Sequence, residues 1–240
     1  LDQAQRAAAD EYMKAISIKA PSAKKVYDGT ELTANSYDVI SGELESGDTL
    51  VVEYSGSITN AGTTANKIVK VTAKDASGKD VTAKYKISTQ DGTLEITKAP
   101  LTVTAKSAEK VYDGKALTAN TCEVKGSLAK GHKISATVTG SQTQIGSSKN
   151  KASNVKIVDA NGNDVTANYN ITYSGAEVTV SKYSGEVVIT AKDATKPYDG
   201  SALTASNDVT VSGLLGTDTV EAKVSGEATV PGKDGTAKVD

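Results

Sequence analysis

The sequence predicts an all-β protein of small two-layer β-sandwich modules, immunoglobulin-like and arranged in tandem, with a short helix at the N-terminus. Three observations predict it. The 240-residue chain has no Phe or Trp, so its core must be filled by Val, Ile, Leu, Ala and Tyr, and branched side chains favour strands. Short runs alternate between apolar and polar residues and are separated by turn pairs such as Asp-Gly. Finally, one long sequence pattern occurs three times.

The pattern is marked by a repeated Tyr-Asp-Gly. Its three aspartates are 85 and 86 residues apart, a period too long for a solenoid repeat and therefore typical of tandem domains. Late in the first two copies, "DVTAKYKI" returns as "DVTANYNI", which brings Tyr85 and Tyr169 into register. The motif residues are Tyr27, Asp28 and Gly29; Tyr112, Asp113 and Gly114; and Tyr198, Asp199 and Gly200.

The recurrence divides the chain into a leader and three repeats. The leader is 1–15, repeat one is 16–98, repeat two is 99–182 and repeat three is 183–240. The leader is rich in Ala, Gln, Glu and Lys, which favour helix, so a short helix is expected there. Repeat three has no counterpart of "DVTANYNI" or of the closing strand, and we interpret it as truncated.

The strands can be placed most clearly on repeat two. Alternation predicts strands at 101–106, 133–138 and 154–158, and the segments on either side of Ser174-Gly175 predict a hairpin. One buried face per strand is expected from this pattern, as in a two-layer sandwich. A β-grasp-like module is the alternative if 116–124 forms a short helix.

Each Tyr-Asp-Gly is predicted to be a structural corner. Gly accepts positive φ, and the Asp carboxylate can accept hydrogen bonds from nearby backbone N–H groups. The Tyr ring is expected to lie on the core of its own repeat, with its hydroxyl on a polar partner. Equivalent surroundings for Tyr27 and Tyr112, and a separate core in each repeat, follow from this interpretation. A role in binding is the alternative.

No catalytic residue, cofactor site or metal site is predicted, and we expect the chain not to be an enzyme. His132, the one histidine, is interpreted as an exposed turn residue, because a catalytic histidine needs a nucleophile or carboxylate partner. Cys122 is interpreted as an incidental thiol, with a reactive or cross-linking role as the alternative. The stretch "DANGND" at 159–164 is expected to be a hairpin loop, with a calcium site as the alternative. A Lys–Asn amide cross-link is compatible with the composition, but the sequence does not place one.

Charge and hydropathy narrow the classes of partner. The net charge of −2 argues against a nucleic-acid groove or a polybasic membrane patch, each of which needs clustered positive charge. No apolar run approaches the roughly 20 residues that span a bilayer. Residues 1–15 are charged and polar and do not resemble a signal peptide, so we interpret the chain as cytosolic or as an interior piece of a longer exported protein. A monomer is expected.

The stretch "LTVTAKSAEKVYDGKALTAN", a Thr-x-x-Gly step and "DVTANYNITYSGAEVTVSK" together resemble the MBG/YDG-type repeats of bacterial cell-surface proteins. The resemblance covers about 16–240, with the third copy incomplete. It implies an extracellular, adhesin-like protein, secreted or attached to the cell wall, and the scarcity of cysteine is common in exported proteins of Gram-positive bacteria. It further implies a stalk that projects a distal adhesive or enzymatic head, with neighbouring repeats as partners. The alternative is an adhesin module that binds a host surface protein or glycan directly.

Overall fold

The computed structural model describes residues 12–205, 207–230 and 237–239 and shows an all-β fold. The described residues form strands and two single-turn 3₁₀ helices, η1 (Thr82–Lys84) and η2 (Thr166–Asn168), without an α-helix. The leader helix expected over 1–14 falls largely outside the described residues. Lys14 already belongs to the first strand.

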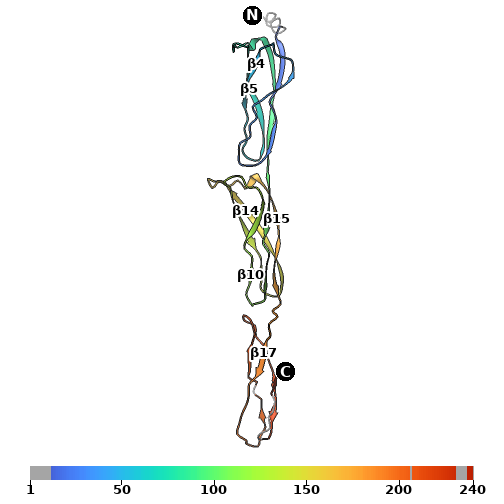
Figure 1. The fold of residues 1–240 in the computed structure, drawn as a ribbon, viewed down its shortest axis with the longest axis vertical. Coiled ribbons are helices and arrows are strands. Elements are labelled where there is room, and N and C mark those ends of the chain that lie inside the picture. Colours follow the sequence, from blue (N-terminus) through green and yellow to red (C-terminus); the bar gives the residue numbers. More distant parts are fainter. Residues whose placement is uncertain (1–11, 206, 231–236, 240) are drawn as a thin grey trace. The chain divides into compact units, whose positions relative to one another are not determined.

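Repeat one forms two sheets (Figure 1). One has the order β3-β1-β6 and the other β2-β7-β5-β4. The first strand pairs in parallel with β6, which places Ile16 opposite Ile87, and β2 pairs in parallel with β7. The strands are β1 (Lys14–Lys19), β2 (Ala23–Val26), β3 (Asp38–Ser41), β4 (Thr49–Ser55), β5 (Gly62–Lys74), β6 (Tyr85–Gln90) and β7 (Gly92–Thr97).

Repeat two has the same sheet orders. Its three-stranded sheet is β11-β8-β15, its four-stranded sheet is β12-β14-β16-β9, and β10 pairs with β13. The segment 116–124 contains β10 and the start of β11 rather than a helix, so the condition set for a β-grasp module is not met. The strands are β8 (Ala99–Ala105), β9 (Ala108–Val111), β10 (Leu117–Thr118), β11 (Cys122–Gly126), β12 (Lys133–Thr139), β13 (Ser141–Gln142), β14 (Gly146–Val158), β15 (Tyr169–Ser174) and β16 (Ala176–Ser181).

Repeat three forms three two-stranded sheets among its described residues, β17-β19, β18-β21 and β20-β22. The pair β17 and β19 is antiparallel, like β1 and β3 in repeat one. The strands are β17 (Val188–Ala191), β18 (Leu203–Thr204), β19 (Val209–Ser212), β20 (Val224–Ser225), β21 (Glu227–Ala228) and β22 (Lys238–Val239).

The chain divides into two compact units, and the boundary between them crosses repeat two. Unit 1 contains the described residues up to Val103 together with Val124–Thr137 and Ser153–Tyr173. Unit 2 contains Thr104–Glu123, Val138–Ala152 and the described residues from Ser174 onward. The described residues of repeat one and three segments of repeat two therefore belong to one unit, and the other segments of repeat two belong with the described residues of repeat three to the other unit.

The core of repeat one draws side chains from both of its sheets. Ile16 and Ile18 of β1 are fully buried and share a cluster with Leu50 of β4, Ala73 of β5 and Tyr85 of β6. Alternate residues of β1 supply these side chains, because successive residues of a strand point to opposite faces. This core thus depends on aliphatic side chains and on Tyr85, with the partly buried Tyr37 packed against it.

A buried asparagine fixes a loop in each of the first two repeats. Asn66, in the middle of β5, is fully buried, and its Nδ2 donates to the carbonyl oxygens of Pro21 (3.0 Å) and Ala34 (2.8 Å). Asn150 of β14 likewise donates to the carbonyls of Lys106 (2.7 Å) and Ala119 (2.8 Å). Each buried amide therefore fixes two loop carbonyls of its own repeat through hydrogen bonds from the middle of a strand.

Each of these amides also lies against a glycine, Asn66 against Gly56 and Asn150 against Gly140. The Oδ1 of Asn150 faces Gly140, where an added Cβ would come within 2.6 Å of it. A glycine is therefore required opposite this asparagine.

We predict that Asn66→Ala destabilises repeat one by about 1–3 kcal/mol, because two loop carbonyls lose the buried amide that donates to them. The exposed Asn35→Ala is the matched control and should change stability by less than about 0.5 kcal/mol. Urea denaturation followed by the NMR amide signals of repeat one measures both. Equal stability of the two variants would contradict this role for Asn66.

Candidate functional site: the joints between repeats

Each Tyr-Asp-Gly forms the same turn from local hydrogen bonds, as the sequence predicted. The glycine has positive φ in every copy, and the aspartate Oδ1 accepts the backbone N–H two residues later. The lysine three residues before the aspartate donates to the same carboxylate, a contact that the sequence analysis missed. The glycine φ values are 81°, 75° and 80° for Gly29, Gly114 and Gly200. The distances from the backbone nitrogen to the aspartate Oδ1 are 2.9, 2.9 and 3.0 Å for Thr30, Lys115 and Ser201. The distances from the lysine Nζ to the same Oδ1 are 2.7, 2.5 and 2.9 Å for Lys25, Lys110 and Lys196.

These contacts stabilise the ionised carboxylates. The hydrogen bond from Lys25 and those from Thr30 hold the pKa of Asp28 well below its usual value. In the third turn, the hydrogen bonds from Lys196 and Ser201 lower the pKa of Asp199 from 3.8 to about 2. The turn is thus built by its own residues, because the same bonds recur in all three copies.

Tyr27 packs against the next repeat. Only 6% of its surface is exposed, and its ring meets that of Tyr169 edge-on, with centroids 5.4 Å apart and an interplanar angle of 84°. The imidazole of His132 is 6.0 Å from the Tyr27 ring. We expected the ring to lie on the core of its own repeat, and that expectation is wrong, because Tyr27 shares its cluster with residues of repeat two.

A single hydrophobic cluster contains residues of both repeat one and repeat two, within unit 1. The expectation of a separate core in each repeat is therefore wrong at this joint. The cause is the short connection, since β8 begins two residues after β7 ends and brings Ala99 and Leu101 directly against Tyr27. The buried members are Tyr27, Ile96, Ala99, Leu101, Ala129, Ile157 and Tyr169.

Tyr169 is held in place by a turn of its own repeat. Its hydroxyl accepts the N–H of Ala129 (3.0 Å) and lies 2.8 Å from the Nδ1 of His132. Tyr85 of repeat one has the same arrangement, accepting the N–H of Glu45 (2.9 Å) and donating to the Oδ2 of Asp48 (2.6 Å). His132 thus takes the place of Asp48, and the tautomer of its ring decides which of the two groups donates.

The interpretation of His132 as an exposed turn residue therefore needs correction. It does lie in a turn, because its N–H donates to the carbonyl of Ala129 (3.0 Å). Its side chain, however, is half-buried between Tyr27 and Tyr169. Its register with Asp48 and Asp218 is the sequence signal for this role, since all three positions can accept a hydrogen bond from a tyrosine hydroxyl.

Two hydrogen bonds to the side chain of Asn168 also connect repeat one to repeat two at the first joint. The buried Asn168 of η2 accepts the N–H of Ala61 at its Oδ1 (2.8 Å), and its Nδ2 donates to the Oδ1 of Asn60 (3.1 Å). Asn60 and Ala61 lie inside the Thr-x-x-Gly step of repeat one. The Thr-x-x-Gly step and the Tyr-Asp-Gly turn of repeat one therefore both contact the segment of repeat two that contains Asn168 and Tyr169.

The second joint, within unit 2, uses the same turn with a different contact. The hydroxyl of half-buried Tyr112 donates to the Oδ1 of Asp218 at 2.9 Å. This hydrogen bond raises the pKa of Tyr112, because ionisation would place two negative charges together. A Cβ added to Gly114 would lie 2.8 Å from the Cα of Gly216, so the two backbones are in close contact.

Tyr198 is neither buried in an apolar cluster, as Tyr27 is, nor half-buried with its hydroxyl on an aspartate, as Tyr112 is. Its side chain is 68% exposed, although the turn that carries it has the same local bonds. The three tyrosines thus occupy three environments: a shared apolar cluster, a hydrogen bond to the next repeat, and solvent. The expectation that Tyr27 and Tyr112 have equivalent surroundings is wrong.

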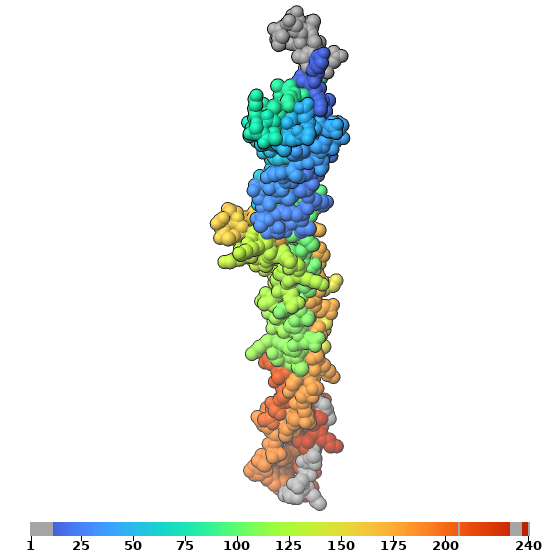
Figure 2. Space-filling view, turned by 45° about the horizontal axis from the view of Figure 1, so that its top comes forward, coloured from blue at the N-terminus to red at the C-terminus, as the bar shows by residue number. Residues whose placement is uncertain are grey.

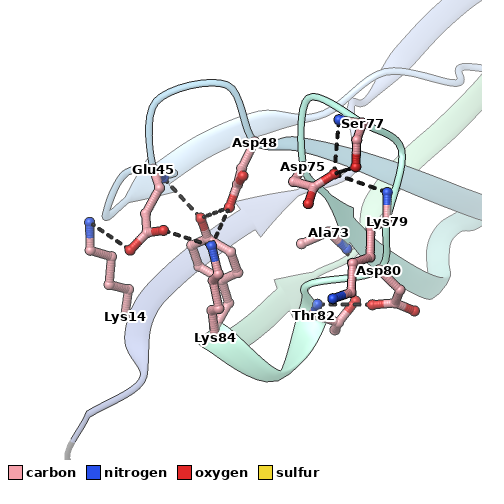
Figure 3. A network of polar contacts seen from close by, with 11 residues as sticks. Lys14, Glu45, Asp48, Ala73, Asp75, Ser77, Lys79, Asp80, Thr82 and Lys84 are labelled. Carbon is pink, nitrogen blue, oxygen red and sulfur yellow. Dashed lines mark hydrogen bonds and ion pairs between the residues drawn. The ribbon is translucent and has the colours of Figure 1, made fainter.

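The residues of repeat one that correspond to the surface packed against Tyr27 are charged. Glu45 is paired with Lys84 (2.9 Å) and lies 3.7 Å from Lys14, and Lys84 is also 3.7 Å from Asp48 (Figure 3). Glu45 and Lys84 occupy the positions of Ala129 and Asn168. Repeat one therefore has an ion-pair network at the positions where repeat two has the surface against which the Tyr27 ring packs.

The turn at 159–164 is a hairpin loop, as predicted. It stands out from the surface, in yellow, in Figures 1 and 2. The Oδ1 of Asp159 accepts the N–H groups of Asn161 and Asn163, both at 2.9 Å, so this carboxylate organises the loop. Across the described parts of the chain, no three or more His, Cys, Asp and Glu side chains gather as metal ligands would.

The remaining sequence candidates lie apart from the joints. Cys122 is a free, half-buried thiol on β11. Among the residues that the structure describes, no helix has the length and apolar character needed to cross a bilayer.

A scan against protein-family models found no match, and a search of curated proteins found no similar sequence. The resemblance to MBG/YDG-type repeats therefore rests on the repeated residues themselves.

We predict that Tyr27→Ala opens the first joint at a cost of about 3–5 kcal/mol, the usual penalty for removing a buried aromatic ring. Tyr198→Ala is the matched control: it deletes the equivalent side chain where that side chain is exposed to solvent, and it should change stability by less than about 0.5 kcal/mol. Hydrogen exchange of the amides around Ala129 and Tyr169 measures the opening. If both variants left this exchange unchanged, Tyr27 would not hold the joint.

We also predict that the carboxyl of Asp199 titrates near a pH of about 2 and that Lys196→Met moves its pKa back toward 3.8. Because the pKa is lower in the folded state, the stabilisation it contributes is present above about pH 4 and is lost as the pH falls toward 2. The ¹³C signal of the side-chain carboxyl follows this titration directly. An unshifted Asp199 in the unaltered chain would show that the lysine contact does not form in solution.

Proposed function

We propose that this chain is a structural stalk: tandem immunoglobulin-like β-sandwich modules in a bacterial surface protein that hold a distal adhesive or enzymatic head away from the cell wall. The observation that carries the proposal is the first joint. Tyr27 of one repeat is buried in a cluster supplied largely by the next, so the residues that define the repeat also connect it to its neighbour.

The sandwich assignment is supported by the shared core of repeat one. Ile16 and Ile18 from one sheet pack with Leu50 and Ala73 from the other, as the inner faces of two layers do. Repeat two has the same sheet orders. We propose the module boundaries 16–98, 99–182 and 183–240 on this basis.

The short connections support a spacer role. The last strand of repeat one ends at Thr97 and the first of repeat two begins at Ala99. With one intervening residue and a buried ring, the joint has little freedom to bend, which is what a spacer requires. In this proposal the neighbouring repeats are the partners, no residue has a catalytic role and no cofactor is needed.

The extracellular location and the membership of the MBG/YDG family are proposed from the sequence resemblance. The repeated "YDG", the "DVTANYNI" segment and the closing "EVTVSK" are the residues on which it rests. Attachment to a Gram-positive cell wall belongs to the same proposal.

A second candidate function is direct adhesion to a host protein or glycan. It is favoured by β3, an edge strand of repeat one on which Val39 and Ile40 are both about half exposed. An exposed edge can accept a strand from a partner through backbone hydrogen bonds.

Small-angle X-ray scattering tests the stalk. A compact globule of this length has a radius of gyration of about 18 Å, whereas three modules in a row, on the order of 100 Å long, give about 30 Å. For the unaltered chain we expect the larger radius of gyration. For Tyr27→Ala we expect a smaller radius or a broader distribution of distances, because the first joint is loosened. A compact particle would overturn the proposal, and capture of a host glycoprotein that Val39→Lys abolishes would favour adhesion.

A further inference from the structure

The first strands of repeat one run parallel to its last strands in one constant register. Strand β1 pairs with β6 and β2 pairs with β7, and each pair joins residues that are 71 apart in the sequence, from Lys14 with Tyr85 to Val26 with Thr97. One further hydrogen bond follows, from the N–H of Tyr27 to the carbonyl of Thr97 (2.8 Å). We call this pairing of the two stretches the parallel ladder of repeat one.

The ladder continues where both stretches pass from one sheet to the other. The N–H of Ala20 donates to the carbonyl of Gln90 (2.9 Å), and the N–H of Thr93 donates to the Oγ of Ser22 (3.0 Å). The carbonyl between Ala20 and Ser22 accepts from the buried amide of Asn66. The two stretches are therefore hydrogen-bonded to each other before, at and after the change of sheet.

Parallel pairing puts the two ends of repeat one at opposite ends of this ladder. Lys14 lies beside Tyr85 at one end, and Thr97 lies beside Val26 at the other (Figure 1). Tension along the chain enters repeat one at Lys14 and leaves it at Thr97, so it pulls the two stretches past each other along their own axis. The intervening strands β3, β4 and β5 bear no tension until the ladder separates, because the ladder holds both ends of the segment that contains them.

Tension in this direction loads the hydrogen bonds of the ladder together. The bonds of a parallel pair are evenly spaced along the strands, so sliding one strand past the other strains all of them at once. A force that parts two strands from one end breaks the same bonds one after another. The pairing in repeat one is therefore the arrangement that resists tension best for a given number of hydrogen bonds.

Repeat two has the corresponding second half of the ladder, within unit 2. Strands β9 and β16 pair in parallel, from Ala108 with Val178 to Val111 with Ser181. The N–H of Tyr112 then donates to the carbonyl of Ser181 (2.9 Å), as its counterpart does at the end of the ladder in repeat one. In both repeats the tyrosine of Tyr-Asp-Gly thus supplies the last hydrogen bond.

We propose that the parallel ladder makes repeat one a mechanical module, which keeps its fold under tension along the chain because its first and last strands must slide past each other before it opens. This inference rests on the proposed stalk and adds the force that the stalk withstands. Tyr27 has two roles in it. Its N–H closes the ladder on Thr97, and its ring is buried in the cluster with repeat two, so one residue passes tension across the first joint.

The test pulls repeat one in two directions within the full chain, at constant force in magnetic tweezers. Handles on Lys14→Cys and Lys98→Cys load the ladder from opposite ends, and handles on Lys14→Cys and Lys86→Cys load it from one end. All three lysines are exposed, and Cys122→Ser leaves only the introduced thiols to react. At the same force we expect repeat one to open at least about tenfold more slowly when pulled from opposite ends, because several hydrogen bonds must break together.

Removal of one hydrogen bond gives an independent readout. Ser22→Ala deletes the acceptor of the Thr93 N–H at an exposed position. It should raise the opening rate about threefold or more under pulling from opposite ends and leave it unchanged under pulling from one end, where the bonds nearest Lys14 break first. Ser77→Ala is the matched control, because it also deletes a serine hydrogen bond, to Asp75 (2.7 Å), but outside the ladder, and it should change neither rate.

Equal opening rates in the two directions would overturn the proposal, since the direction of the load would then not matter. An opening rate that Ser22→Ala does not raise under pulling from opposite ends, or raises no more than Ser77→Ala does, would also overturn it. The amide NMR spectrum of repeat one checks that each variant is folded. Failure here would leave an extended particle in the scattering test as it is, and a compact particle there would remove the stalk without changing the dependence on direction.

Discussion

The burial of one tyrosine ring against another across the first joint is the contact on which the rest of the arrangement depends. A repeat without Phe or Trp has few large side chains to bury, so a ring committed to the neighbouring repeat is a large part of its apolar surface. Tyr27 gives that surface to a cluster in which Tyr169 and Ile157 belong to the next repeat. The stability of each repeat is thereby linked to the presence of its neighbour, as in other tandem-repeat proteins in which interfaces supply part of the folding free energy.

The turn that presents the tyrosine is independent of that contact. Lys196 and Ser201 bond to Asp199 in the third turn just as their counterparts do in the first, although Tyr198 is exposed and Tyr27 is buried. The carboxylate, the lysine three residues earlier and a glycine with positive φ are sufficient to fix the backbone. Because the geometry exists before any neighbour is bound, joining two repeats does not require the turn to become ordered, which reduces the entropic cost of forming the joint.

Local features could be predicted from the sequence and long-range partners could not. The repeats, the strand-rich class and the hydrogen bonds of the Asp-Gly turn follow from residue types and spacing, because those interactions join residues close in the chain. The environment of Tyr27 depends on Ala129 and Tyr169, more than 100 residues away, and a ring that must be buried does not reveal which surface buries it. Two signals in the sequence point to these partners: His132 is in register with Asp48 and Asp218, and Asn66 and Asn150 have the same spacing from Gly56 and Gly140.

The surface of repeat two that packs against Tyr27 also differs in charge from the corresponding surface of repeat one. Repeat two offers Ala129 and Asn168, a small side chain and an amide, to the ring of Tyr27. Repeat one has Glu45 and Lys84 at these positions, and their ion pair would have to be broken and desolvated before a tyrosine ring could replace it. Exposed ion pairs contribute little stability, but a charge buried beneath an aromatic ring without its partner is costly. The surface of repeat one therefore disfavours a tyrosine turn that repeat two accepts, so the two repeats are not interchangeable at this joint despite their common fold.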